Sequence, residues 1–149
     1  MKKIALLILS VSSLIVVSCT KDESNTTKTP AEYLTAKDWM LTEASYTITI
    51  GGKDSIVSIF LSIPACQRDN LMKFETSKVV TEKCGATKCT PSDPYSVPAG
   101  MWELISNNTQ LRIIDSDTTD ANIRTLNATT FKFNELSSGM NILMTYTAQ

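Results

Sequence analysis

The sequence predicts an all-β domain of eight or nine short antiparallel strands preceded by a short helix, and three observations support this fold class. After residue 38, short runs rich in Val, Ile, Thr, Tyr and Phe alternate with turn residues. No segment in this part of the chain sustains a hydrophobic period of 3.6 residues. Alternation is clearest near the C-terminus, where Met140, Ile142, Met144 and Tyr146 form one stripe. A closed up-and-down barrel and a sandwich both satisfy this pattern.

The N-terminal 18 residues are predicted to be a signal peptide rather than a buried core helix. A cationic start, Met1–Lys3, precedes an apolar run from Ile4 to Val17 that is too short to span a bilayer with ordinary flanks. The segment Val16-Val17-Ser18-Cys19 then resembles a bacterial lipobox. That resemblance implies that Cys19 becomes the lipidated first residue of the mature protein.

The resemblance further implies a diacylglyceryl group and an N-acyl chain on Cys19, which together would hold the protein firmly on a membrane. Removal of two lysines with the signal peptide leaves 12 basic against 15 acidic residues, so the net charge changes from -1 to -3. Residues 20–23 resemble the Lys-plus-acidic export tag of surface lipoproteins, and also fit a plain solvated linker. We therefore expect a lipidated flexible tether at residues 19–29 and an outer-membrane lipoprotein of the Gram-negative envelope; the two interpretations of residues 20–23 leave open whether it is exposed at the cell surface.

The folded domain is predicted to span residues 30–149 and to open with a helix. Thr29 is a typical N-cap, Pro30 suits the first helical position, and Glu32 completes a capping box. We expect about two turns of helix, ending near Asp38.

Nine strands are predicted after this helix. Their approximate ranges are 39–50, 53–60, 71–75, 78–83, 100–106, 110–115, 121–126, 130–136 and 140–147. In the first strand, Trp39 and Leu41 share one parity whereas Tyr46 and Ile48 share the other, which predicts a β-bulge near residues 43–45. Turn sequences at 51–52, 107–108 and 137–139 separate several of the strands.

An ordered set of segments covering about residues 33–147 resembles the small lipocalin-like domains of bacterial lipoproteins. The first has Trp39 opening a strand after a short helix. The others are Cys66-x-x-Asp69-Asn70-x-x-x-Phe74, the stretch 85–94 around Cys89, Gly100-x-Trp102-x-Leu104, and Leu126-x-x-Thr129-x-Phe131. The resemblance implies a closed up-and-down barrel, with Trp39 packed in the core at its closed end.

The chain departs from the lipocalin pattern in two places. Lys37 stands where lipocalins usually carry a glycine, and no C-terminal arginine is placed to cover Trp39. Both departures weigh against a deep, open ligand cavity.

Once Cys19 is assigned to lipid, three cysteines remain in an oxidising compartment. Loop-closure entropy separates a Cys66–Cys89 bond from a Cys66–Cys84 bond by only a few tenths of a kcal/mol, so it does not choose between them. The lipocalin-like resemblance implies Cys66–Cys89. Cys84 is then a free thiol beside two lysines, either a half-buried spectator or a redox-active group. A three-cysteine metal site is disfavoured by the spacing and by the lack of histidine.

Composition excludes several functions. The absence of histidine removes Ser-His-Asp and Cys-His catalysis and His-ligated zinc, and a net charge of -1 provides no basic surface for nucleic acid. Asp115, Asp117 and Asp120 resemble a calcium loop superficially, but they lack the glycine and distal glutamate of an EF-hand, so a solvated hairpin tip is the preferred interpretation. We expect a non-enzymatic protein with no cofactor and no catalytic or metal site.

Two functional hypotheses follow, with a hydrolase or redox enzyme disfavoured by the missing histidine. In the first, a lipid-anchored barrel binds a small apolar or amphipathic ligand, or a surface protein partner, at its mouth. In the second, the protein is a structural or interaction subunit without a small-molecule ligand. The residues expected to fill the barrel in that case are Trp102, Leu104, Phe131, Phe133 and Met144.

Overall fold

The computed structural model describes residues 28–137 and 139–149. The predicted signal peptide, the lipidation at Cys19 and most of the tether lie outside the described residues. Within the described part of the chain, no helix has the length and apolar character needed to cross a membrane.

All nine predicted strands are present, together with the predicted first helix. The strands are β1 (Asp38–Ile50), β2 (Lys53–Ser58), β3 (Leu71–Phe74), β4 (Val79–Lys83), β5 (Ser96–Ile105), β6 (Gln110–Ile114), β7 (Thr118–Leu126), β8 (Thr130–Ser137) and β9 (Met140–Ala148). The helices are α1 (Pro30–Ala36), the 3-10 turn η1 (Phe60–Ser62) and α2 (Ala65–Arg68).

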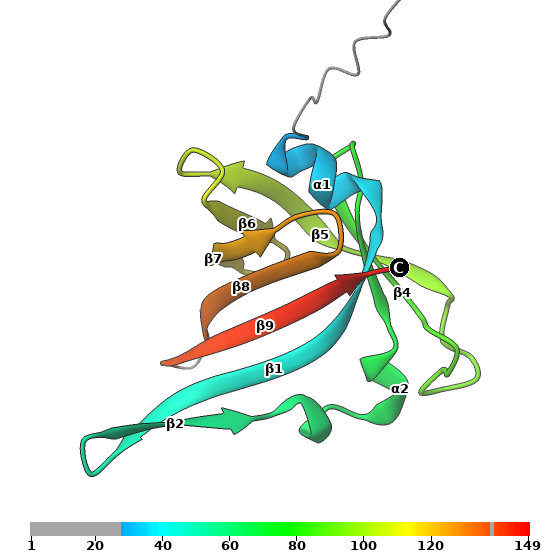
Figure 1. Cartoon of the computed structure of the whole chain (residues 1–149). Helices are drawn as coiled ribbons and strands as arrows, with labels where there is room; N and C mark the ends of the chain where they lie inside the picture. The colour runs from blue at the N-terminus through cyan, green and yellow to red at the C-terminus, as the bar shows by residue number, and fades with distance from the viewer. Residues whose placement is uncertain (1–27, 138) are drawn as a thin grey trace, which may run out of the picture.

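Eight of the strands form a closed antiparallel barrel (Figure 1). β9 pairs with β8 on one side and with β1 on the other, and this second pairing closes the sheet. β2 is the extra strand, because it pairs with Ser45–Ile50 of β1 and lies outside the ring. The prediction of an up-and-down barrel behind a short helix is confirmed, and the sandwich is excluded.

α1 covers one end of the barrel, which we call the floor. The predicted capping box is present: the Thr29 backbone N–H donates to Glu32 Oε2 at 2.6 Å, and the Glu32 N–H donates back to the threonine hydroxyl at 3.3 Å. Leu34 is fully buried beneath the helix. The Trp39 indole N–H donates to the Leu34 carbonyl at 2.9 Å, which fastens α1 to the first barrel strand.

Aromatic side chains fill the interior above α1. Phe131 lies at their centre, with its ring centroid 5.7 Å from Trp39 and 5.9 Å from Phe74, both in edge-to-face geometry. Phe133 lies 4.9 Å from Phe131 and also stacks on Tyr146, with ring centroids 5.7 Å apart. As expected from the resemblance, Trp39 is a core residue at the closed end.

The predicted β-bulge in β1 is present, slightly earlier in the chain than expected. The register between β1 and β9 shifts between Leu41 and Glu43, so Thr42 is the inserted residue. Its hydroxyl donates to the Thr145 carbonyl at 3.1 Å. Because of this inserted residue, Trp39 and Leu41 face the barrel interior together with Ala44. This is the change of facing along β1 that the sequence pattern required.

Four segments differ from the prediction. β5 begins at Ser96 instead of residue 100, and it tolerates Pro98 because this first half pairs with β4 alone. β7 begins at Thr118 instead of residue 121, since its first residues pair with the end of β6. Residues 60–62 and 65–68 form two short helical turns that the sequence analysis did not predict.

Replacing Phe131 with alanine should destabilise the barrel by about 3–5 kcal/mol, because it removes the ring on which the core packs. Urea denaturation monitored by tryptophan fluorescence measures this change. Leu136→Ala is the matched control, since Leu136 is 73% exposed and should change stability by less than about 0.5 kcal/mol. Equal losses for the two variants would contradict the assigned core.

Candidate functional site: the barrel mouth

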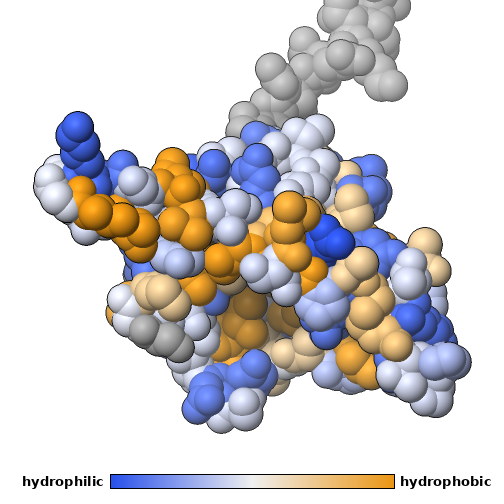
Figure 2. All heavy atoms as spheres, turned by 90° about the horizontal axis from the view of Figure 1, so that it is seen from below, coloured by the Kyte–Doolittle hydropathy of each residue, from blue (hydrophilic) through white to orange (hydrophobic). Residues whose placement is uncertain are grey.

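The end of the barrel opposite α1 is open, and we call it the mouth. β1 pairs with β3 only over Asp38–Met40; beyond this it stays paired with β9 as far as Tyr46, and from Ser45 its other edge pairs with β2. β3 and β4 are only 4 and 5 residues long, so the wall on this side is low. Viewed from the end opposite α1, the surface is hollowed and the depth of the hollow is apolar (Figure 2).

Two cavities lie at the mouth, of about 200 Å³ and about 100 Å³. They share Gln67, Asn70 and Glu82 and therefore adjoin one another. The larger is bounded by all three cysteines of the domain and by Asp93, Pro94 and Val97. The smaller has an apolar wall made by Leu41, Leu71, Met72 and Tyr146. The mouth is thus apolar on one side and polar on the other.

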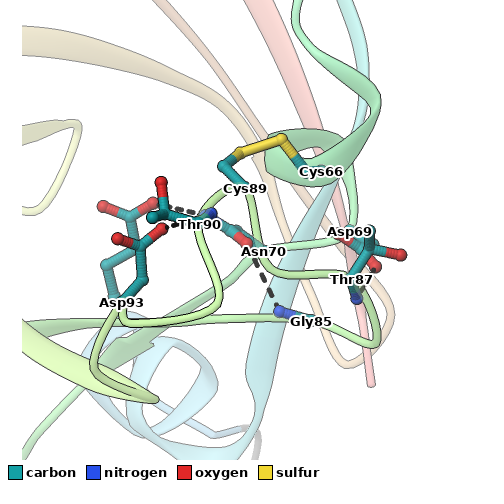
Figure 3. Close-up of a disulfide and its surroundings, with 9 residues drawn as sticks. Cys66, Asp69, Asn70, Gly85, Thr87, Cys89, Thr90 and Asp93 are labelled. Carbon is teal, nitrogen blue, oxygen red and sulfur yellow. Dashed lines mark hydrogen bonds between the residues drawn. A yellow bond between two sulfur atoms is a disulfide. The ribbon is translucent and has the colours of Figure 1, made fainter.

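A disulfide between Cys66 and Cys89 forms the side of the larger cavity, as the lipocalin-like resemblance implied. It joins α2 to the loop between β4 and β5, with the two Cα atoms 5.1 Å apart. Hydrogen bonds reinforce this connection (Figure 3). The Thr87 N–H donates to Asp69 Oδ2 at 3.0 Å, and the Gly85 N–H donates to Asn70 Oδ1 at 3.3 Å.

Gly85 allows this close contact between the loop and α2. A Cβ atom at position 85 would lie 2.2 Å from the Asp69 carbonyl oxygen, well inside any allowed contact. Only glycine therefore fits between the loop and the end of α2.

Cys84 is the free cysteine among the described residues, and it is half-buried in the wall of the larger cavity. Its thiol donates to the Pro94 carbonyl at 3.4 Å. The two lysines expected beside it are engaged elsewhere. Lys83 forms an ion pair with Asp38 at 2.7 Å, and Lys88 donates to the Asp93 carbonyl at 2.6 Å.

Two glutamates lie on the inward-facing side of their strands near the mouth; Glu82 is exposed to solvent and Glu135 is half-buried. Glu82 follows the buried Val80 by two positions on β4, and Glu135 follows the buried Phe133 by two positions on β8, so each shares the inward parity. The sequence analysis missed both residues. The alternation of apolar residues along β4 and β8 could have identified them, since each glutamate occupies the next position in a stripe of apolar side chains.

Tyr146 is buried below these glutamates, with 8% of its surface exposed. Its hydroxyl donates to the thioether sulfur of Met144 at 3.8 Å and has no nitrogen or oxygen partner among the described residues. Burial raises the pKa of Tyr146, and the negative charges of Glu135 and Glu82 raise it further. Both carboxylates therefore act electrostatically on this hydroxyl, which stays protonated at neutral pH.

Burial also raises the pKa of Glu135 above its ordinary value of 4.5. Within the described part of the chain, no lysine or arginine forms an ion pair with Glu135 or Glu82. Among the described residues, the donor to the Glu82 carboxylate is the Asn70 side-chain amide, at 2.8 Å from Oε1. The second carboxylate oxygen of Glu82 has no hydrogen-bond donor among the described residues.

The aspartates that resembled a calcium loop do not converge on one point. Asp115 and Asp117 form an exposed turn in which the Asp117 N–H donates to Asp115 Oδ1 at 2.9 Å. Asp120 lies on β7 and accepts hydrogen bonds from Arg112, at 2.7 Å from Nε, and these bonds lower the pKa of its carboxyl. Within the described ranges, no three acidic or cysteine side chains are arranged to hold a metal ion.

Comparison with known proteins assigns no family. No model of a known protein family matches the chain, and no curated protein matches it. The function is therefore argued from the geometry of the mouth and from the residues of this chain.

The disulfide should contribute about 3 kcal/mol to stability, because it closes a loop of 23 residues. Replacing both Cys66 and Cys89 with serine should lower the free energy of unfolding by that amount. Cys84→Ser is the control and should leave it within about 0.5 kcal/mol. Mass spectrometry of a non-reduced digest should show the Cys66–Cys89 peptide, and a crosslink through Cys84 would contradict the assignment.

Replacing Glu135 with glutamine should stabilise the protein at pH 7. The pKa of Glu135 is higher in the folded state than in the unfolded state, so its contribution to stability is lost as pH rises through the folded pKa. Below pH 4.5 the carboxyl is protonated in both states, and the difference between variant and wild type should disappear. Thermal denaturation at pH 4 and pH 7 measures this, with Glu103→Gln on the outer face as the control. A gain that persists at low pH would contradict the burial of Glu135.

Proposed function

We propose that this chain is a lipid-anchored lipoprotein of the Gram-negative envelope, and that its lipocalin-like barrel binds a small apolar or amphipathic molecule at the mouth. The observation that carries the proposal is the pair of adjoining cavities, which have an apolar wall and a few polar groups. Concave sites of this composition are typical of small-molecule binding. Their modest volumes, about 200 and 100 Å³, favour a small ligand.

The floor of the barrel limits how deep such a ligand goes. Trp102, Phe131 and Phe133 are buried and fill the interior near α1, as the filled-barrel hypothesis expected. Leu104 and Met144, named in the same hypothesis, are only partly buried. The barrel is thus packed at the floor and hollow at the mouth, and the ligand would lie above the aromatic core.

A surface partner is the second candidate, and a different observation favours it. Large apolar side chains are exposed on the β1–β2 hairpin and the turn that follows it: Ile50 is 66% exposed, and Ile56 and Leu61 are each 78% exposed. Exposed apolar residues gathered on one face are typical of interaction surfaces (Figure 2). A partner bound there would lie beside the mouth without filling it.

The envelope location is supported by the sequence alone. The cationic start, the apolar run and the lipobox-like Val16-Val17-Ser18-Cys19 together fit a lipoprotein signal. The disulfide agrees with such a location, because disulfides persist in oxidising compartments.

Native mass spectrometry of protein purified from its own host tests the proposal. We expect a chain that begins at a lipidated Cys19 and carries a reproducible small-molecule adduct. Leu41→Phe should reduce the adduct at least severalfold because it fills the smaller cavity, whereas Leu136→Phe on the outer surface should retain it. Repeated absence of any adduct from the intact wild-type protein would refute ligand binding and favour the partner hypothesis.

A further inference from the structure

Two hydrogen-bond acceptors at the mouth, on Glu82 and Tyr146, are left open, whereas the amide of Gln67, which lines both cavities, can both donate and accept. One oxygen of Glu82 already accepts from Asn70, and the other has no donor among the described residues. The Tyr146 hydroxyl gives its hydrogen to a sulfur atom, so the lone pairs of its oxygen are also unmatched. Both residues line the smaller cavity. A ligand that satisfies this site must therefore supply hydrogen-bond donors.

The Asn70 amide and the two basic side chains nearest the mouth are already engaged. Asn70 uses its amide nitrogen on Glu82, and its amide oxygen accepts from Gly85. Arg68 on α2 lies over the ring of Phe60, at 5.7 Å from its centroid, and Lys88 on the neighbouring loop donates to a backbone carbonyl. No basic side chain of the described residues is thus paired with the mouth carboxylates.

The charged residues that line the two cavities are both acidic. Glu82 and Asp93 line the larger cavity, and Glu135 projects inward from the opposite side of the barrel on β8. The lysines of β3 and β4, Lys73 and Lys83, point outward and pair with Asp38. These carboxylates attract a cation and repel an anion, and because Glu82 is exposed, water screens its part of this interaction.

The incomplete bonding of Tyr146 gives independent support. A hydroxyl that is more than nine-tenths buried normally finds a strong partner, because leaving it unpaired costs about 1–3 kcal/mol. Tyr146 has only a thioether, which is a weak acceptor. Tyr146 is one of the residues that line the smaller cavity, so a donor bound there lies next to this residue.

We propose that the mouth binds a small amphipathic amine, whose ammonium group lies between the Glu82 carboxylate and the Tyr146 hydroxyl and whose apolar part packs on Leu41 and Met72. This inference rests on the proposed ligand-binding function and specifies its chemical class. An ammonium group supplies three donors and a positive charge, matching the open acceptors and the carboxylates. The cavity of about 100 Å³, next to one of about 200 Å³, suits a short alkyl or aryl chain.

Calorimetric titration of the purified full chain with hexylamine, hexan-1-ol and hexanoate tests the inference, because the three probes share a six-carbon chain and differ in the head group. Hexylamine should bind most tightly and hexanoate least. Glu82→Gln should weaken hexylamine binding about tenfold or more while leaving hexan-1-ol nearly unchanged. The matched control is Glu103→Gln, which removes the same charge from the outer face of β5 and should not alter binding.

Tyr146→Phe provides a second test, since it removes the hydroxyl and keeps the ring. We expect a severalfold loss in hexylamine affinity with no loss of thermal stability, because the hydroxyl lacks a strong partner in the free protein. Binding of hexanoate as tight as hexylamine, or an unchanged hexylamine affinity in Glu82→Gln, would overturn the amine assignment and leave ligand binding at the mouth intact. Failure of all three probes to bind would overturn the amine assignment together with the ligand-binding proposal.

Discussion

The hydrogen bond from the Trp39 indole to the Leu34 carbonyl determines how the barrel is closed. It lets a large ring enter the core without leaving its N–H unpaired, and it holds α1 against the end of the barrel. The indole N–H of Trp102 is also paired, because it donates to the Glu75 carbonyl at 3.0 Å. With both indoles fixed, Phe74 and Phe131 pack edge to face between them, and the floor is filled.

The mouth follows from the unequal lengths of the strands. β1 has 13 residues, but only its first three pair with β3, and its later part carries β2 instead. The wall that β3 and β4 do not complete is supplied by α2 and the disulfide-linked loop. These segments place amide and carboxylate side chains at the mouth. Longer β3 and β4 strands would instead place alternating apolar side chains there. The combination of a packed floor and a polar-rimmed mouth is therefore a consequence of strand geometry.

Much of this fold was predictable from the residues, for identifiable reasons. Alternating apolar positions located all nine strands, and the parity change in β1 required a bulge, although it lies at Thr42 and not at residues 43–45. Glycines 51 and 52 take the left-handed conformation that the hairpin turn needs, with φ of 58° and 77°. The early start of β5 was missed because Pro98 disfavours a strand, and the sequence does not reveal that this half lacks a second neighbour. The pairing of Cys66 with Cys89 came from the resemblance, since loop entropy left it open.

The mouth was less accessible to sequence reasoning. Glu82 and Glu135 are polar residues in apolar stripes, and such a position predicts either a strand end or an inward-facing charge. Only closure of the ring shows that β4 and β8 face each other across the interior. The weak bonding of the Tyr146 hydroxyl likewise depends on contacts between strands that are distant in the chain. Residues 1–27, which carry the predicted anchor, lie outside the described structure.

The position of α1 places the N-terminal entry of the chain at one end of the barrel and the mouth at the other. The chain enters the domain through α1, on the floor side, and α2 lies toward the other end (Figure 1). The two cavities are lined by residues of α2 and of the strands and loop beside it. An attachment at the N-terminus, as proposed, would therefore join the domain at its floor and leave the mouth free of the attachment point. Any pull on the tether would act on the helix that seals the floor, so loading and release at the mouth are mechanically separate from attachment.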